Sequence, residues 1–351
     1  MKRLVLCFDG TWNTPDQRDR GGVPTASNVT KFAMTVRPAD AEGTAQRVYY
    51  HTGLGTGRGL DRILGGAFGF GISRNIKDGF GFLAREFEQG DEIYLVGFSR
   101  GAYTARSLAG LIRSCGILLP AHRHRVEAAY RLYRRRDKDS HPAAQESVLF
   151  RRTFSRQPDA RIRFIGVWDT VGALGIPSRF LLLPALLFRQ FHDVNLSSYV
   201  DRAYQVLAID EERRPLRPTL WTQQPHAVGQ VLEQVWCAGV HANVGGGYED
   251  SGLSDVALGW MLDRAESSGL ALDRGAIDPP LSPDAMGVLR ESRLGVYRLE
   301  RPYLRPIAAS ARSSARAGGA QPFVTFESVH RSVGDRIPAD LDYRPRNVLG
   351  G

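Results

Sequence analysis

The chain has 351 residues, 42% of them hydrophobic, which is enough for one enzyme-sized globular domain with a large core and insertions. Its formal net charge is +9, carried almost entirely by arginine, because lysine occurs only four times. Three scattered cysteines, Cys7, Cys115 and Cys237, form neither a disulfide framework nor a metal-type pair, which excludes a disulfide scaffold and suits a reducing compartment.

The N-terminal segment begins MKRLVLCFDG, and its apolar run is too short for a signal peptide. A second apolar run, FLLLPALLF at 180–188, is too short to span a bilayer and contains a proline. The sequence therefore predicts a cytoplasmic protein. Because lipases need an apolar surface at the active-site mouth, we also expect the 180–188 run to border that mouth, with core packing as the alternative.

Apolar strand patterns alternate with helical patterns along the chain, which is typical of an α/β protein. Several strands are continuously apolar, so we expect a mostly parallel sheet with helices on both faces. The predicted strands cover 4–8, 47–51, 92–98, 161–169 and 231–240, and the predicted helices cover 76–89, the segment after Ser99, and 255–267.

We expect one domain over 1–351 with inserted segments. An arginine-rich helical excursion is predicted at about 122–157 and a second insertion at about 176–230. A stretch rich in Arg, Ser, Ala and Gly predicts a mobile loop at about 308–322.

The first strand leads into the motif FDGTWN. Its Asp9-Gly10-Thr11 is similar to the end of a phosphatase D-x-D-G-T motif, but Cys7 stands where that chemistry needs an aspartate nucleophile, so we reject that reading. In a hydrolase the loop after this strand can donate one oxyanion-hole N–H, here from Gly10 or Thr11, with Asp9 holding the loop. A plain Asp-Gly turn is the alternative.

The most informative segment is EIYLVGFSRGAYTARSLAGLI at 92–112, in which an apolar strand meets a helix at Gly97-Phe98-Ser99-Arg100-Gly101. This is the G-x-S-x-G nucleophile elbow, where a sharp turn lifts the serine hydroxyl clear of the sheet. The helix that follows directs its N-terminal N–H groups, that of Arg100 first, toward the position of an oxyanion. A tight glycine turn with an idle serine is the alternative.

A serine nucleophile needs a base, and the base needs an acid that orients it. The predicted strand RIRFIGVWD ends at Asp169, where an acid of this kind belongs. The alternative is an aspartate that caps the following turn.

Two histidines compete for the role of base. His241 follows the strand QVWCAGV and precedes a glycine triplet, whereas His330 follows a strand-like run near the C-terminus. His51 also ends a strand but precedes Ser99, against the usual hydrolase order. Generic hydrolase topology favours His330, and spacing alone leaves both open.

Five segments together resemble the hydrolase-like catalytic domain of the type VI secretion phospholipase effector family, within the α/β-hydrolase superfamily. They occur in family order: LVLCFDGTWN (4–13), GFSRGAYTAR (97–106), GVWDTVGALG (166–175), GVHANVGGGY (239–248) and SVHRSV (328–333). The resemblance implies an α/β-hydrolase core and a serine triad of Ser99, Asp169 and His241. It also implies phospholipase A-type activity in secreted members, so export by a type VI apparatus is an alternative location.

We therefore expect an esterase or lipase that needs no cofactor or metal and acts on esters, with phospholipids as candidate substrates. The arginine excess suggests peripheral contact with an anionic membrane, while nucleic acid is not expected as a partner. The sequence gives no signal for the oligomeric state. Two other functions stay open: a catalytically silent interaction module, and an arginine-rich binder of anionic lipid or nucleic acid.

Overall fold

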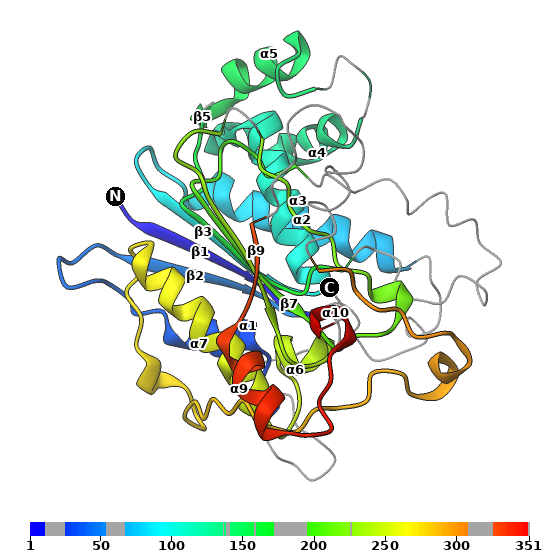
Figure 1. The fold of residues 1–351 in the computed structure, drawn as a ribbon. Helices are drawn as coiled ribbons and strands as arrows, with labels where there is room; N and C mark the ends of the chain where they lie inside the picture. Colours follow the sequence, from blue (N-terminus) through cyan, green and yellow to red (C-terminus); the bar gives the residue numbers. More distant parts are fainter. Residues whose placement is uncertain are drawn as a thin grey trace.

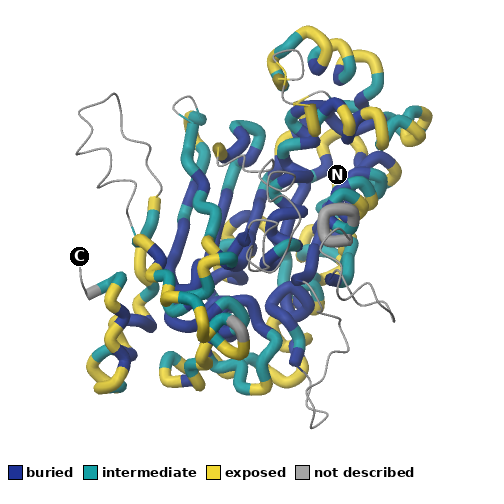
Figure 2. The backbone as a smooth tube through the Cα atoms, turned by 90° about the vertical axis from the view of Figure 1, so that its right-hand side faces the viewer, coloured by how far each residue is buried: buried dark blue, intermediate teal, exposed yellow. Residues whose placement is uncertain are grey.

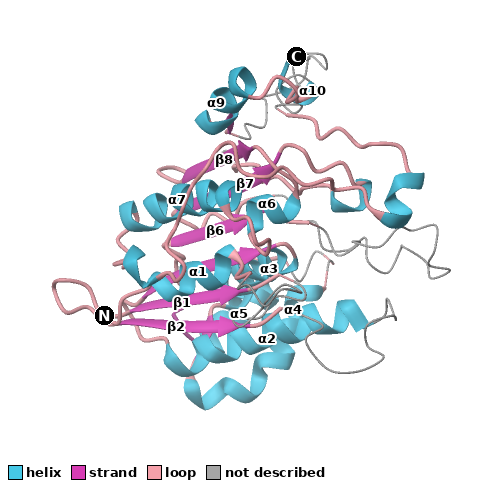
Figure 3. Ribbon diagram, turned by 90° about the horizontal axis from the view of Figure 1, so that it is seen from below, coloured by secondary structure: helices cyan, strands magenta, loops and turns pink. Residues whose placement is uncertain are grey.

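The computed structural model describes residues 1–10, 25–53, 67–135, 137, 141–157, 159–171, 195–224, 227–307 and 326–349. Within this part of the chain the main element is a seven-stranded sheet in the order β2-β1-β3-β6-β7-β8-β9, with every neighbouring pair parallel. Figures 1 and 3 show the strands as one twisted layer between helices. The predicted α/β class with a mostly parallel sheet is confirmed.

The strands of this sheet have the following bounds: β1 Arg3–Phe8, β2 Gln46–His51, β3 Glu92–Phe98, β6 Phe164–Trp168, β7 Arg202–Ala208, β8 Val231–Cys237 and β9 Glu327–Val329. The helices are α1 Asn28–Thr35, α2 Ala67–Glu86, α3 Arg100–Cys115, α4 Val126–Arg134, α5 Gln145–Phe154, α6 His241–Gly245, α7 Gly252–Ser267, α9 Arg331–Ala339 and α10 Arg346–Leu349. A two-stranded antiparallel sheet joins β4 Ile117–Leu118 to β5 Ser155–Gln157.

Side chains alternate along β1 between two hydrophobic cores, as the period of two in a strand requires. Leu4, Leu6 and Phe8 pack against α2 and α3, whereas Val5 and Cys7 pack with α1 and α7 on the opposite face. Figure 2 shows buried backbone in the central strands of the sheet, whereas the edge strands β2 and β9 are mostly intermediate or exposed. All three cysteines are buried and free, and burial raises the pKa of Cys115 and of Cys237 to about 12, so these thiols stay protonated.

The chain reverses its direction of travel across the sheet at β1. It moves from β1 to β2 on one side and then returns to place β3 on the other side, with α1 covering one face and α3 the opposite face. In open parallel sheets such a switch point, at the carboxyl ends of the strands, is where ligand sites form. Here it lies between the end of β1, next to Asp9, and the end of β3, next to Ser99.

One predicted boundary needs correction. The insertion predicted at 176–230 is wrong over 202–208, because these residues form β7, which pairs with both β6 and β8. The strand was missed because Arg202 and Gln205 interrupt its apolar pattern, although Gln205 is fully buried and bonds the carbonyl of Thr219. Within 122–157 the chain forms α4, α5 and β5. The predicted loop at 308–322 and the 180–188 run lie outside the described residues.

No helix in the described ranges is both long and apolar enough to cross a membrane.

Candidate active site

Ser99 lies in the turn between β3 and α3 with a strained backbone. Its φ of 56° and ψ of −117° are rare for a residue with a side chain, and such conformations cluster at functional sites. The Ser99 N–H donates to the carbonyl of Trp168 at 3.0 Å, which ties the turn to β6. The sharp turn predicted from G-x-S-x-G is therefore present in the structure.

Both flanking glycines are required by the close approach of backbones. A Cβ on Gly101 would lie 2.0 Å from the carbonyl oxygen of Phe8, and one on Gly97 would lie 2.5 Å from the carbonyl oxygen of Gly101. Real Cβ atoms do not approach backbone this closely, so strand β1 and the start of α3 can meet only through glycine.

Gly101→Ala is therefore expected to be strongly destabilising, by several kcal/mol, because the added methyl overlaps a backbone carbonyl that cannot move away. Urea unfolding measures this change. The matched control is Gly259→Ala, also within a helix, where a Cβ would meet nothing within 4 Å. That substitution is expected to raise stability by up to about 1 kcal/mol, because alanine is the better helix former. Equal stabilities for the two variants would contradict the packing argument.

A chain of hydrogen bonds connects Ser99, His241 and Asp169. The Nε2 atom of His241 lies 2.9 Å from the Ser99 Oγ, and its Nδ1 atom lies 2.5 Å from the Asp169 Oδ2. Because a carboxylate only accepts, Nδ1 carries the proton and Nε2 is left to accept the serine hydroxyl. The Asp169 side chain is fully buried, whereas that of His241 is 12% exposed and Ser99 is 8% exposed, so the aspartate end is the most deeply buried part of this hydrogen-bond chain.

The three side chains come from the carboxyl ends of three parallel strands. Ser99 follows β3, Asp169 follows β6 and His241 is the first residue of α6, just beyond β8. Asp169 has a positive φ of 39°, so two of the three described non-glycine residues with positive φ belong to this site. The ring of Phe98 packs on the imidazole at a centroid distance of 4.7 Å and limits its rotation.

Among charged groups, Arg305 lowers the pKa of Asp169 most, and no sequence pattern marks it among the many arginines. Its guanidinium donates to both carboxylate oxygens, at 2.6 and 3.0 Å. The backbone N–H of Ala208 donates to Oδ1 at 3.2 Å. Burial alone would raise the pKa of Asp169, but Arg305 and His241 hold it well below the usual carboxyl range.

A second buried carboxylate, Glu211, supports the turn at His241 and was also not predicted. It accepts the His241 backbone N–H at 3.2 Å, and Arg213 donates to its two oxygens at 2.8 and 2.7 Å. Burial opposes ionisation of Glu211, but Arg213 lowers its pKa and keeps it charged. His241 is thus held in place by a hydrogen bond from its backbone N–H as well as by those of its ring.

Asp9 collects hydrogen bonds at the end of β1. Its Oδ2 accepts from the hydroxyls of Ser27, Thr30 and Tyr50 at 2.6, 3.0 and 2.5 Å. Its Oδ1 accepts the Gly10 N–H at 2.6 Å, so this N–H is already engaged and is a poor candidate for an oxyanion donor. Of the other predicted donors, Arg100 begins α3 directly after Ser99, and Thr11 lies outside the described residues.

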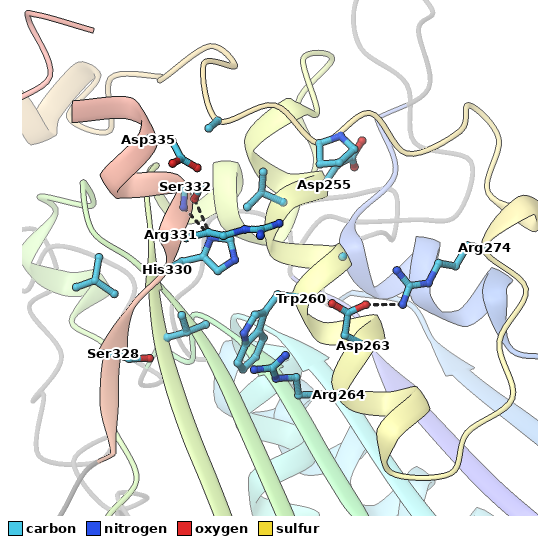
Figure 4. Close-up of a pocket in the computed structure, with 16 residues that line it drawn as sticks. Asp255, Trp260, Asp263, Arg264, Arg274, Ser328, His330, Arg331, Ser332 and Asp335 are labelled. Carbon is cyan, nitrogen blue, oxygen red and sulfur yellow. Dashed lines mark hydrogen bonds and ion pairs between the residues drawn. The ribbon is translucent and has the colours of Figure 1, made fainter. Parts of the chain in front are cut away.

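His330 does not contact Ser99 in any hydrogen bond of the described residues. Its Nδ1 accepts the backbone N–H of Ser332 at 3.2 Å, which makes it the N-cap of α9. The ring borders a cavity of about 660 Å³ that is also lined by Trp260 and Arg264 (Figure 4). Burial, Arg331 and Arg264 lower the pKa of His330, so it is neutral at neutral pH. None of Ser99, Asp169 and His241 lines this cavity.

The fold and this site define an α/β protein in which a serine in a strand-to-helix turn bonds a histidine, and that histidine bonds an aspartate, all at the carboxyl ends of strands of one parallel sheet. Residues 2–264 match the family model for the type VI secretion system phospholipase effector, Tle1-like, catalytic domain. The chain belongs to this family, which confirms the resemblance found in the sequence.

Among similar proteins is an uncharacterized protein of Saccharomyces cerevisiae, 31% identical over 255 residues, which cover 67% of this chain and 35% of that protein. A solved structure of an uncharacterized protein from Pseudomonas aeruginosa aligns with a TM-score of 0.49 and 15% identity, over 99% of this chain and 55% of that one. The Tle1 effector bound to the VgrG spike of the type VI secretion system aligns with a TM-score of 0.40 and 20% identity, over 71% and 51%. The chain thus spans between about a third and just over half of the length of these proteins.

Proposed function

We propose that this protein is a serine hydrolase that cleaves carboxylic esters, and that phospholipids are among its substrates. The observation that carries the proposal is the hydrogen-bond chain from Ser99 Oγ through His241 to Asp169, with distances of 2.9 and 2.5 Å. A catalytically silent module would not need these distances, and neither would an arginine-rich binder. The phospholipid part rests on membership of the Tle1-like family.

The proposed reaction follows from the positions of these groups. His241 Nε2 accepts the Ser99 proton as Oγ attacks the ester carbonyl, and Asp169 stabilises the imidazolium that forms. In this proposal the backbone N–H of Arg100, the first residue of α3, donates to the tetrahedral oxyanion. His241 then protonates the leaving alcohol, and water releases the acyl group from Ser99. No step uses a metal or an organic cofactor.

The test uses a fluorophosphonate probe followed by a panel of acyl esters and phospholipids. Mass spectrometry of the labelled protein should locate one adduct, on Ser99. Hydrolysis of short esters but not phospholipids would keep the serine hydrolase and remove the lipid substrate. Labelling elsewhere, or none, would end the proposal. The family also associates these domains with type VI secretion, so export of this chain by such an apparatus is part of the same proposal.

The lipid substrate is further supported by an exposed segment near the site, residues 294–304. Leu294, Leu299 and Leu304 are 58%, 82% and 47% exposed, and the arginines at 298 and 301 are exposed between them. The segment is tied to the region after β7, where the Tyr303 N–H bonds the Glu212 carbonyl at 2.9 Å. Exposed leucines beside cationic side chains fit an anionic lipid surface.

Leu299→Asp is therefore expected to weaken binding to vesicles of mixed phosphatidylglycerol and phosphatidylcholine by about tenfold or more, because burial of a leucine is worth about 1.5–3 kcal/mol. Co-sedimentation measures the loss, and hydrolysis of p-nitrophenyl butyrate in solution should be unchanged. Leu341→Asp, at a leucine that is 77% exposed outside this segment, is the matched control. Equal vesicle binding by the two variants would contradict the docking role of the segment.

A further inference from the structure

Arg305 and Asp169 form a buried pair with two parallel hydrogen bonds. The Nη1 and Nη2 atoms of Arg305 lie 2.6 and 3.0 Å from Oδ1 and Oδ2 of Asp169, and neither side chain has any exposed surface. This fork-to-carboxylate geometry fixes the plane of the carboxylate as well as its charge. Because Oδ2 is the atom that faces His241, the fork also fixes the orientation of the hydrogen bond to the imidazole.

The guanidinium is itself held by the backbone. Nη1 donates to the carbonyl of Ala208 at 2.9 Å, at the end of β7, and Nη2 donates to the carbonyl of Leu216 at 2.6 Å. If this side chain moved away, two buried carbonyls would lose a donor and a buried carboxylate would lose its cation, which is costly. Arg305 is therefore held rigidly by the backbone, and its two bonds to Asp169 fix the position of that carboxylate.

The pair also changes the electrostatics of the proposed triad. A fully buried carboxylate without a cation tends to take up a proton, and a protonated Asp169 could no longer stabilise an imidazolium. Because the guanidinium of Arg305 bonds both carboxylate oxygens, it opposes protonation of Asp169.

We propose that Arg305 is a positioning residue of the serine-hydrolase site, which holds Asp169 ionised and aligned with His241 and sets the lower pH limit of activity. This inference rests on the proposed function. It assigns a role to a residue 136 positions away from Asp169 in the sequence, in a segment with no hydrolase motif.

Other charged groups surround the Asp169–His241 pair, and a pH effect must be separated from them. Glu211, Arg213 and Asp210 follow β7, and at the neighbouring strand ends Arg100 begins α3 beside Ser99 and Asp9 follows β1. Glu211 is paired with Arg213. Asp210 accepts the Gly239 N–H at 2.7 Å, two residues before His241, and burial raises its pKa to about 6. Titration of Asp210 could therefore resemble the effect of Arg305 on the pH dependence of activity.

The experiment compares Arg305→Gln with Arg305→Lys, using the rate of fluorophosphonate labelling of Ser99 as a function of pH. Arg305→Gln removes both the positive charge and the pair of parallel hydrogen bonds to Asp169. The low-pH limb of its pH–rate profile should move to higher pH by about one unit, because loss of the cation favours the protonated form of Asp169. Its plateau rate should fall by on the order of 10- to 100-fold, because the acid is no longer held in place. Arg305→Lys keeps the charge but not the fork, so its limb should stay near that of the wild type while the plateau rate falls.

Two controls exclude a merely structural effect. Arg151→Gln removes another buried arginine that bonds backbone carbonyls, those of Ser114 and Pro142, and should lower stability without moving the limb. Asp210→Asn should leave the limb in place. The inference is overturned if Arg305→Gln keeps the wild-type limb, or if Arg151→Gln or Asp210→Asn moves it equally. If Arg305→Gln does not fold, Arg305→Lys decides, because wild-type labelling by that variant would also overturn it.

Failure of the proposed function is recognised separately. A wild-type protein that neither labels nor hydrolyses esters ends the hydrolase proposal. The effect of Arg305 is then read without catalysis, from an NMR pH titration of the His241 imidazole, assigned with His241→Gln. A titration unchanged between wild type and Arg305→Gln would overturn the inference on its own.

Discussion

Ser99→Ala is expected to lower kcat for ester hydrolysis by on the order of 10⁶-fold, the loss seen when the nucleophile of a serine protease triad is removed. The methyl group of alanine cannot form the acyl intermediate. The hydroxyl that lies 2.9 Å from His241 Nε2 in the wild type is absent, so the imidazole has no proton to accept. Labelling by fluorophosphonate should disappear. A residual rate above that of water would come from the oxyanion donors and substrate binding.

The fold should survive this substitution, since alanine removes only one oxygen from a residue that is 8% exposed. Ser114→Ala is the matched control, because Ser114 is a buried serine at the other end of the same helix, α3. It should keep the full rate and full labelling. Undiminished hydrolysis by Ser99→Ala would rule out the serine-hydrolase mechanism.

Sequence patterns predicted the structural features that depend on residues adjacent in the chain. The sharp turn at Ser99 could be predicted because a buried strand, a glycine-flanked turn and a helix are contiguous in sequence. Asp169 and His241 could be placed in the same region because each follows a strand, and parallel strands bring their carboxyl ends to one edge of the sheet. Spacing alone could not separate His241 from His330, because both follow strands that pair with each other, β8 and β9.

The groups that surround the site could not be predicted, because long-range packing creates them. Arg305 meets Asp169 across 136 residues and Glu211 meets His241 across 30, and no short motif marks either contact. Strand β7 was missed because its buried Gln205 looks like a surface residue in sequence, although its amide bonds a backbone carbonyl in the core. Polar residues that are satisfied only by distant partners break the apolar pattern on which sequence prediction rests.

The two histidines give the second large expected effect. His241→Ala should lose nearly as much rate as Ser99→Ala, and the double variant should lose little more, because the members of a triad act as a unit. His330→Ala should keep the rate within a factor of about two, since its ring caps α9 and borders a separate cavity. Its expected cost is about 1 kcal/mol of stability from the lost cap.

Steady-state kinetics with p-nitrophenyl butyrate, together with thermal unfolding, separates the two roles. His241→Ala should change the rate and leave the melting temperature nearly unchanged, because the hydrogen bonds of the 12% exposed imidazole within the described part of the chain go to Ser99 and Asp169. His330→Ala should do the reverse. A larger loss of rate in His330→Ala would overturn the assignment, because the general hydrolase order, with the histidine after the last strand, would then describe this protein better than the hydrogen bonds of His241 do.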